Sequence, residues 1–380
     1  MSKPQVDIRQ LQREEPSAWT ALLRRQPDLD QVTVTAVNTQ SLPTSDPTSA
    51  RSLVRYSLTL ADHSDPITFI GKRTTRTEAL FYKKLAAQIP FLAPHCWLAQ
   101  VTKTAGWIIL DDVPNDYTPE KWDAAAVEDI ISHMTTLHAL HTASWQGQQR
   151  KNTQQWLPHF IDRERKRYTW RALRAEQAVY FDEGPAALIS EHAIQSAGRL
   201  APTLLQAANG IVVMRSLGGW PGILGESHLT AAADLLDDPL PMLEPLSNLP
   251  VTLLHGNPHS YHWRLTLFQE CYLLGWDGVQ IGPGIYDLVR FVEQFDKLYP
   301  HGRNGRMAVR SHSPISEETI VDSYLITMKK KMGGAFDARS ARQAIPAARC
   351  LHVLTTWFPY FATWFAEMPH KYAWQKVNRM

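Results

Sequence analysis

The sequence has few cysteines, almost no net charge and no long hydrophobic run, and each absence excludes a class of protein. Its 380 residues include Cys96, Cys271 and Cys350, an odd number at spacings that fit neither a disulfide framework nor a zinc site. The 39 basic and 37 acidic residues leave a formal net charge of +2, so we expect neither a nucleic acid nor a membrane surface as partner.

The remaining absences concern targeting and domain organisation. No apolar run approaches the roughly 20 residues that a membrane-spanning helix needs. The first residues, MSKPQVDIRQLQREEP, are charged and lack an apolar centre, so we expect no secretory signal and a cytoplasmic location. A hydrophobic share of 44% and a length above that of one ordinary domain predict a folded protein with two lobes.

The first part of the chain has strand patterns around one helix. Residues 31–38 and 51–60 alternate β-branched with polar side chains, which predicts half-buried strands. A third strand ends at Lys72, and the apolar positions after it recur at helical spacing until Pro90. The apolar run 106–113 predicts a buried strand that ends in two carboxylates.

The rest of the chain is predominantly helical in pattern. The segment AAAVEDIISHMTTLHALHTASW has one apolar face, which predicts an amphipathic helix of roughly six turns. Further helices are expected over 151–235, with breaks at Asn209-Gly210 and at 218–221. Two short strands, VTLLHG and CYLLGW, flank a loop and hairpin, and helices follow from Leu288, with a kink expected at Pro359.

These patterns predict an α+β fold with two lobes. The expected N-lobe, residues 1–112, has a small antiparallel sheet of three to five strands and one helix. The expected C-lobe, residues 113–380, is larger and helical and contains a hairpin at 251–277.

Three stretches carry a resemblance to a known family. In chain order they are ITFIGK followed by TEALFYKKLA, then LHGNPHSYHW, then YLLGWDGVQIGPGIYDL. Their order and separations resemble those of the aminoglycoside phosphotransferase and choline kinase family over nearly the whole chain. The resemblance implies a bilobal protein-kinase-like fold, with ATP and magnesium as possible cofactors.

The resemblance also implies roles in nucleotide binding. Lys72 matches a lysine that contacts nucleotide phosphates, and Glu78 matches the glutamate that orients it. Asp111 and Asp112 fall at the hinge, where the family's backbone meets an adenine ring. From the residues alone, Lys72 could instead be a solvated strand end, and Glu78 a favourable acid in a first helical turn.

The catalytic loop departs from the family pattern. His255, Asn257 and His259 occupy catalytic-loop positions, and the two histidines match residues that are structural in the family. Asn257 stands where the family has the aspartate that accepts a proton, and a neutral amide cannot do this near pH 7. His262 stands at an asparagine position that binds magnesium, although magnesium prefers oxygen ligands.

The second metal position and the phosphate-binding loop also differ. Gly275 falls on the family's magnesium-binding aspartate, and Asp277 lies about 6 to 7 Å further along the same strand face. His262 and Asp277 are therefore the candidate metal ligands. Asp287 matches an acid that supports the catalytic loop in the family. The loop Ser41–Ala50 contains no glycine, although phosphate-binding loops need backbone N–H groups that approach closely.

Other residue groups have an ordinary and a functional interpretation. His255, His259 and His262 could hold a metal, but they also fit the catalytic loop. A basic cluster could bind an acidic ligand or form a solvated helix face; it comprises Arg163, Arg165, Lys166, Arg167 and Arg171. An aromatic group could be core, or line an apolar pocket or partner groove; it comprises Trp357, Phe358, Tyr360, Phe361, Trp364 and Phe365.

Three functions fit these substitutions. The leading hypothesis is a catalytically degenerate kinase-fold protein that binds a small molecule or a partner protein through its cleft. The first alternative is an active ATP-dependent phosphotransferase acting on a small hydroxylated metabolite, with Asp277 at the magnesium. The second is a non-kinase enzyme that uses His259 or His262 as acid or base. The sequence gives no indication of the oligomeric state.

Overall fold

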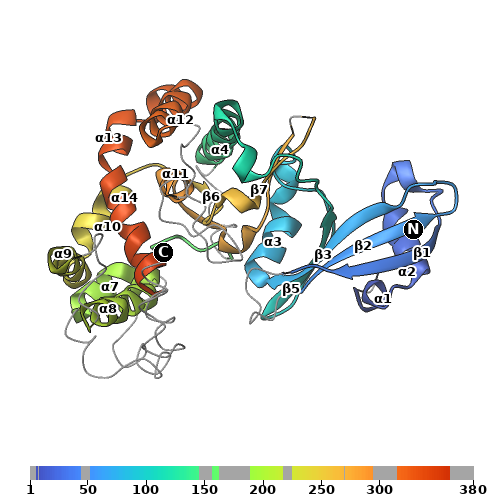
Figure 1. Cartoon of the computed structure of the whole chain (residues 1–380), viewed down its shortest axis with the longest axis horizontal. Coiled ribbons are helices and arrows are strands. Elements are labelled where there is room, and N and C mark those ends of the chain that lie inside the picture. Colours follow the sequence, from blue (N-terminus) through green and yellow to red (C-terminus); the bar gives the residue numbers. More distant parts are fainter. Residues whose placement is uncertain are drawn as a thin grey trace. The chain divides into compact units, whose positions relative to one another are not determined.

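The structure, a computed structural model, describes most of the chain as two compact units (Figure 1). The described residues are 6, 8–43, 52–144, 156–161, 189–216, 225–268, 270–293 and 315–359. The first unit comprises 1–122, 255–257 and 261–279, and the second comprises 123–254, 258–260 and 280–380. Most of the hairpin segment therefore groups with the N-terminal residues, although it lies far along the chain.

The first unit is built on one antiparallel sheet of five strands. Their order across the sheet is β1 (Val34–Ser41), β2 (Leu53–Leu60), β3 (Ile67–Thr75), β5 (Ala105–Asp111) and β4 (Cys96–Val101). The strands predicted from alternation are confirmed. Strand β4 was not predicted, because its six residues are nearly all half-buried and show no clear alternation.

Two short helices cover part of this sheet. They are α1 (Ile8–Gln12) and α2 (Pro16–Leu23), and Figure 1 shows them beside β1 and β2. Pro16 suits the first turn of α2, where its missing N–H has no helical partner. Trp19 is fully buried, and its ring centroid lies 4.8 Å from Tyr56 and 5.6 Å from Phe69. This aromatic contact anchors α2 to β2 and β3.

The helix α3 (Arg76–Lys84) follows β3 directly and packs closely on β5. Thr75 caps its N-terminus by accepting a hydrogen bond from the Glu78 N–H. A side chain at Gly106 would collide with Ala79, so glycine permits this close approach. The helix ends before the predicted limit at Pro90, and a 3₁₀ turn, Ala86–Gln88, follows.

A hairpin and short turns complete the first unit. The hairpin consists of β7 (Trp263–Leu265) and β8 (Cys271–Leu273), which pair antiparallel. The 3₁₀ turns are Pro27–Leu29, Pro119–Lys121, Ser260–His262 and Trp276–Gly278; Ser260 itself belongs to the second unit.

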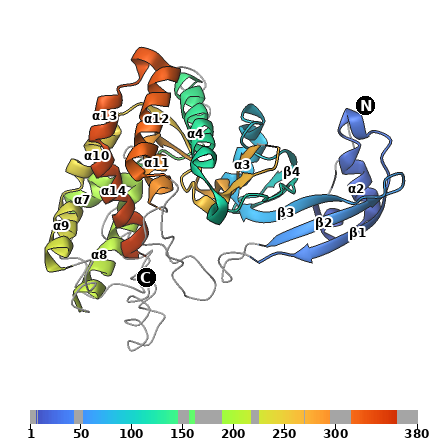
Figure 2. The same cartoon turned by 45° about the horizontal axis from the view of Figure 1, so that its top comes forward.

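The second unit is mainly helical, with one two-stranded sheet. Its helices are α4 (Ala124–Ser144), α7 (Glu191–Ala197), α8 (Ala201–Ser216), α9 (Glu226–Asp237), α10 (Leu240–Ser247), α11 (Ile285–Val292), α12 (Glu317–Met332), α13 (Ala338–Gln343) and α14 (Ile345–His352). Strands β6 (Val251–Leu254) and β9 (Gln280–Pro283) pair antiparallel. The predicted long helix is confirmed as α4, which lies beside α12 in Figure 2.

One predicted interruption is wrong. We expected a break at Asn209-Gly210, but α8 continues through both residues. A side chain at position 210 would collide with the backbone of Phe358. Glycine is therefore present because another backbone lies against this helix, and it does not end the helix.

Several sequence-based interpretations fall outside the described residues. These are the centre of the loop at 44–51, the predicted turn at 218–221, the basic cluster from Arg163 to Arg171, and the aromatic residues from Tyr360 onward. Of the aromatic group, Phe358 is buried and Trp357 is half-buried. A π-helical turn, Val353–Trp357, directly precedes Pro359, whose ring would clash with the carbonyl group of Thr355 in a regular helix.

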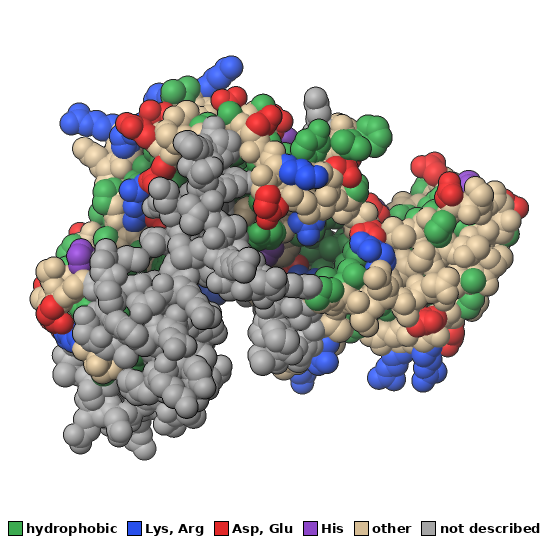
Figure 3. Space-filling model, in the orientation of Figure 1, with side chains coloured by type: hydrophobic (Ala, Val, Ile, Leu, Met, Phe, Trp, Pro, Cys, Tyr) green, Lys and Arg blue, Asp and Glu red, His purple; other side chains and the backbone are tan. Residues whose placement is uncertain are grey.

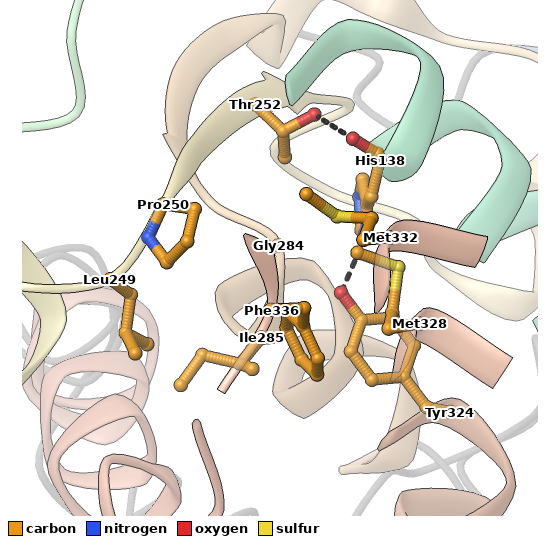
Figure 4. A pocket seen from close by; sticks show the side chains of 10 residues that line it. All are labelled: His138, Leu249, Pro250, Thr252, Gly284, Ile285, Tyr324, Met328, Met332 and Phe336. Atoms are coloured by element: carbon orange, nitrogen blue, oxygen red, sulfur yellow. Dashed lines mark hydrogen bonds between the residues drawn. The ribbon is translucent and has the colours of Figure 1, made fainter. Parts of the chain in front are cut away.

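A small interior cavity marks a buried polar cluster in the second unit (Figure 4). Its volume of about 10 Å³ is close to that of one water molecule. The Tyr324 hydroxyl lies 2.8 Å from His138 Nδ1, and Thr252 Oγ1 donates to the His138 carbonyl at 2.7 Å. Asp287, only 1% exposed, lies 3.6 Å from His138 Nε2. These contacts join α4, β6, α11 and α12.

Charged side chains of both signs lie on the surface of the described residues. Figure 3 shows acidic and basic side chains interspersed on the visible face of each unit. Within the part of the chain that the structure describes, no helix is both long and apolar enough to cross a bilayer.

We predict that His352 makes the second unit sensitive to acid. Burial, reinforced by the positive charge of Arg290, lowers the pKa of His352 from 6.5 to about 3. The unfolded chain therefore binds one more proton than the native state between these values, so stability falls as the pH falls. The expected loss is about 2 kcal/mol between pH 7 and pH 5.

Urea unfolding of wild type and His352→Gln at both pH values checks this prediction. The variant should lose less stability on acidification than wild type. The exposed His192 provides a matched control, and His192→Gln should behave as wild type. Equal acid sensitivity in wild type and His352→Gln would contradict the prediction.

Candidate active site

The Glu78 carboxylate is the centre of the candidate site. Its side chain is 1% exposed. Its two oxygens accept hydrogen bonds from Lys72 Nζ, Oε1 at 2.8 Å and Oε2 at 2.7 Å. The Thr74 hydroxyl also donates to it, and the Trp276 backbone N–H donates to Oε1 at 3.2 Å. Lys72 is therefore not a solvated strand end, whereas Glu78 does lie in the first turn of α3 and is buried there. The carboxylate joins β3, α3 and the turn after β8.

Lys72 and Glu78 line a cavity of about 800 Å³ in the first unit. Apolar side chains on its wall include Leu53, Ile70, Leu110, Val113 and Leu274. Charged and ionisable side chains include Arg55, Lys72, Glu78, Asp111, Asp112, His262, Arg264 and Asp277. The wall therefore combines apolar surface with cations and carboxylates in similar numbers.

The two hinge acids have side-chain partners within the first unit. Asp111 Oδ1 accepts a hydrogen bond from Trp97 Nε1 at 2.6 Å. Asp112 accepts two hydrogen bonds from Arg55, one from Nε at 2.6 Å and one from Nη2 at 3.3 Å. The carboxylates thus fix the hinge to β4 and β2, and both residues line the cavity.

His255 has a structural role in the loop. Its Nε2 donates to the Leu274 carbonyl at 2.9 Å, because a carbonyl can only accept. Its Nδ1 accepts from the Asn257 N–H at 3.3 Å. The ring is fully buried against Trp276, with 4.7 Å between centroids. The two ring nitrogens thus contact the backbone of Leu274 and that of Asn257.

Gly256 allows this loop to pass close to the turn Trp276–Gly278. Its φ of +82° favours glycine, and a side chain would collide with the Gly278 carbonyl. The following residue, Asn257, has an exposed side chain and is not among the cavity-lining residues. His259 belongs to the second unit and is half-buried.

His262 occupies the space beside Gly275. Gly275 has a φ of +79°, and a Cβ at this position would lie 3.1 to 3.2 Å from three atoms of the His262 ring. His262 Nδ1 donates to the Asn257 carbonyl at 2.8 Å. Burial lowers the pKa of His262, and the Asn257 carbonyl and the charge of Asp277 oppose this only in part. A neutral imidazole therefore packs against Gly275, and a Cβ there would require the ring to move by a few tenths of an ångström.

Asp277 faces the same cavity from the turn after Gly275. Its charge acts on His262, which places the two side chains in one electrostatic environment. Among the described residues, no group of three or more histidine, cysteine or acidic side chains could hold a metal ion. The donors present at the family's metal positions are thus an imidazole and one displaced carboxylate.

Two cavity residues were missed by sequence reasoning. Arg55 lies two residues after Leu53 on β2 and therefore on the same face of the sheet, which was the available signal. Arg264 lies on β7, and its Nη1 donates to the Tyr261 carbonyl at 2.7 Å. Both line the cavity. Neither belongs to a recognisable motif, so only the strand register identifies them.

The order of the five-stranded sheet and the helical second unit define the class of fold. The chain has the bilobal, kinase-like α+β fold of the aminoglycoside phosphotransferases and choline kinases. No protein-family model matches the chain, and no curated protein matches it in sequence.

Solved structures show where the likeness lies. The chain is similar to choline kinase from Cryptosporidium parvum Iowa II, with a TM-score of 0.50 and 9% identity over 95% of this chain and 93% of that chain. It is also similar to an aminoglycoside-3'-phosphotransferase of type VIII, with a TM-score of 0.42 and 12% identity over 83% and 93%. A third is amicoumacin kinase hAmiN in complex with AMP-PNP, Ca²⁺ and Ami, with a TM-score of 0.46 and 12% identity over 93% and 89%.

We predict that removing Lys72 destabilises the first unit. Lys72→Met leaves the Glu78 carboxylate buried without its cation, and such a change costs about 3–5 kcal/mol. Urea unfolding measures the loss. Lys83→Met, at an exposed position of α3, should change stability by less than about 0.5 kcal/mol.

A double variant separates charge from packing. Lys72→Met with Glu78→Leu removes both charges and should be more stable than Lys72→Met alone, because no carboxylate remains buried without a partner. If Lys72→Met and Lys83→Met had equal effects, the Glu78 cluster would not have the stabilising role assigned to it.

Proposed function

We propose that the cavity of the first unit binds a small molecule and that the protein does not transfer phosphoryl groups. The observation that carries this proposal is the contact between His262 and Gly275. An imidazole fills the space in which phosphotransferases of this fold would carry a metal-binding carboxylate. The absence of a carboxylate at position 275 is therefore accompanied by a matching change in the packing around it.

The donor set does not suit magnesium. Magnesium requires near-octahedral oxygen ligands, usually from carboxylates. Gly275 supplies no oxygen ligand. His262 offers a ring nitrogen, and the hydrogen bond to the Asn257 carbonyl already orients this ring. Asp277 provides one carboxylate, which falls short of the family's pair of metal ligands.

The proton acceptor is also missing. Asn257 cannot take the proton of an attacking hydroxyl, because its amide is neutral and only weakly basic. His255 uses both ring nitrogens for the backbone of the hairpin and the loop. Phosphoryl transfer would therefore lack both its base and its metal at these positions.

The cavity itself supports binding of a small molecule. Its volume of about 800 Å³ lies within the range of ligand pockets, which bury most of a ligand against apolar walls. Leu53, Ile70 and Leu274 can cover a flat apolar ring, while Lys72 and Arg264 can face an anionic group. A nucleotide combines these properties, which makes adenine nucleotides suitable first probes.

Other partners fit the molecule less well. We favour a small molecule over a partner protein because the binding surface is a cavity lined by charged pairs. The interspersed surface charge gives no support for nucleic acid. We propose a cytoplasmic location, which suits a chain whose Cys96, Cys271 and Cys350 form no disulfide.

Thermal unfolding with nucleotides tests the proposal. ATP, ADP and AMP are each titrated with magnesium chloride or with EDTA, and ADP formation is measured in parallel. We expect magnesium to leave the nucleotide-induced shift unchanged and ATP to remain intact. A magnesium-dependent shift accompanied by ADP formation would contradict the proposal.

A restored variant provides the positive control. Asn257→Asp, His262→Asn and Gly275→Asp together return the family's residues to the three positions. Aspartate tolerates the left-handed backbone of position 275 better than most residues, and asparagine at 262 frees the space that the imidazole fills. This variant should acquire magnesium-dependent nucleotide binding at least tenfold tighter than wild type.

An active phosphotransferase is the second candidate. Asp277 lines the cavity with the intact Lys72–Glu78 pair, and positioning with electrostatics supplies much of the acceleration in phosphoryl transfer. This candidate uses ATP and magnesium and predicts that Asp277→Ala abolishes both nucleotide binding with magnesium and ADP formation. Under our proposal, Asp277→Ala changes neither magnesium sensitivity nor ATP stability.

A further inference from the structure

The second unit contains a partly buried polar cluster around Arg290 that has no role in the proposed function. Arg290, on α11, donates from Nη2 to Thr356 Oγ1 at 3.1 Å. Its guanidinium lies over the Tyr286 ring, 5.1 Å from the centroid. The Tyr286 hydroxyl lies 3.2 Å from Thr355 Oγ1. The cluster therefore joins α11 to the π-helical turn Val353–Trp357.

His352 belongs to the same cluster through Thr356. Its Nδ1 lies 3.2 Å from Thr356 Oγ1. A guanidinium can only donate, so the Thr356 hydroxyl accepts from Arg290 and has its own proton to donate to His352. Nδ1 is then the acceptor, and the neutral ring carries its proton on Nε2. The low pKa of His352 agrees with a neutral ring.

Two donors in this cluster are buried without an acceptor. Arg290 Nε and His352 Nε2 are both inaccessible to solvent and have no hydrogen-bond partner among the described residues. His352 as a whole is 3% exposed. An unsatisfied buried donor is destabilising, and most such donors in native proteins are found to bind water or an ion. Both donors lie in a cluster that carries the positive charge of the Arg290 guanidinium. A negatively charged acceptor would therefore suit them best.

Arg55 provides a comparison, because the Nε and Nη2 edge of its guanidinium has a carboxylate acceptor. Arg55 donates from Nε and Nη2 to the two oxygens of Asp112. Arg290 uses Nη2 for a neutral hydroxyl, and its Nε has no acceptor in the described chain. The Nε edge of Arg290 therefore has the donor geometry that binds a carboxylate or phosphate.

We propose that Arg290 and His352 bind the oxyanion group of a small ligand, a phosphate or a carboxylate. Arg290 Nε and His352 Nε2 donate to the anion, and Thr356 holds both side chains in place. The π-helical turn carries Thr356, which contacts both side chains. All of these residues belong to the second unit, so the inference stands apart from the cavity of the first unit.

Thermal unfolding in different salts tests this site. Wild type is titrated with sodium phosphate, sodium sulfate or sodium acetate, with sodium chloride holding the ionic strength constant. We expect a saturable rise in melting temperature with at least one oxyanion and none with chloride. Phosphate acting alone indicates a phosphate-bearing ligand, whereas acetate acting at similar concentrations indicates a carboxylate. Either result supports the site.

Two variants locate the effect. Arg290→Gln should weaken the oxyanion at least tenfold, because it removes the charge and the Nε donor. Arg342→Gln is the matched control, since Arg342 is an exposed arginine of the same unit and is already paired with Asp322. An equal oxyanion response in Arg290→Gln and wild type would overturn the proposal.

A measurement on wild type avoids dependence on a variant that fails to fold. Nitrogen NMR of ¹⁵N-labelled arginine and histidine side chains follows Arg290 Nε and His352 Nε2 directly. Both signals should move on addition of the stabilising oxyanion and remain in place with chloride. If no oxyanion moves either signal or raises the melting temperature, the two donors are satisfied by water and the proposal is wrong.

Discussion

The buried Glu78 carboxylate is the interaction on which the first unit depends. A carboxylate with 1% exposure is tolerated only where donors surround it, and here they come from a lysine, a hydroxyl and a backbone N–H. These donors lie on β3 and on the turn after β8, while the carboxylate itself lies on α3. One charged group therefore sets the positions of a strand, a helix and a hairpin that are distant in sequence.

The neighbouring contacts extend this arrangement to the loop. Trp276, whose N–H reaches Glu78, stacks on Phe81 with 4.1 Å between ring centroids. The Trp276 ring also packs against the His255 ring, which is hydrogen-bonded to the Leu274 carbonyl and so holds the loop in place. None of these contacts involves a metal ligand or a proton acceptor. The contacts from Glu78 through Trp276 to His255 therefore do not include the side chains of His262, Asp277 or Asn257.

The sequence predicted β1, β2, β3 and β5 because alternation at 31–38 and 51–60 and apolar runs are local patterns. The Lys72–Glu78 pair was expected from the resemblance to the phosphotransferase family, and the structure shows the ion pair at the junction of β3 and α3. Strand β9 has only four residues, too short for a pattern. Arg55 opposite Asp112 depends on how β2, β3 and β5 align, which no local pattern encodes. The break expected at Gly210 failed for a similar reason, since its cause lies in Phe358, far along the chain.

The contact between His262 and Gly275 restricts how this site can change. An acidic side chain introduced at position 275 meets the imidazole, while a smaller residue at 262 alone removes packing and the hydrogen bond to the Asn257 carbonyl. Each substitution alone is unfavourable while the original residue remains at the other position. The effects of the two substitutions on stability are therefore strongly non-additive. A carboxylate at position 275 would therefore require a change at His262 in the same step, so the two positions are linked by their packing.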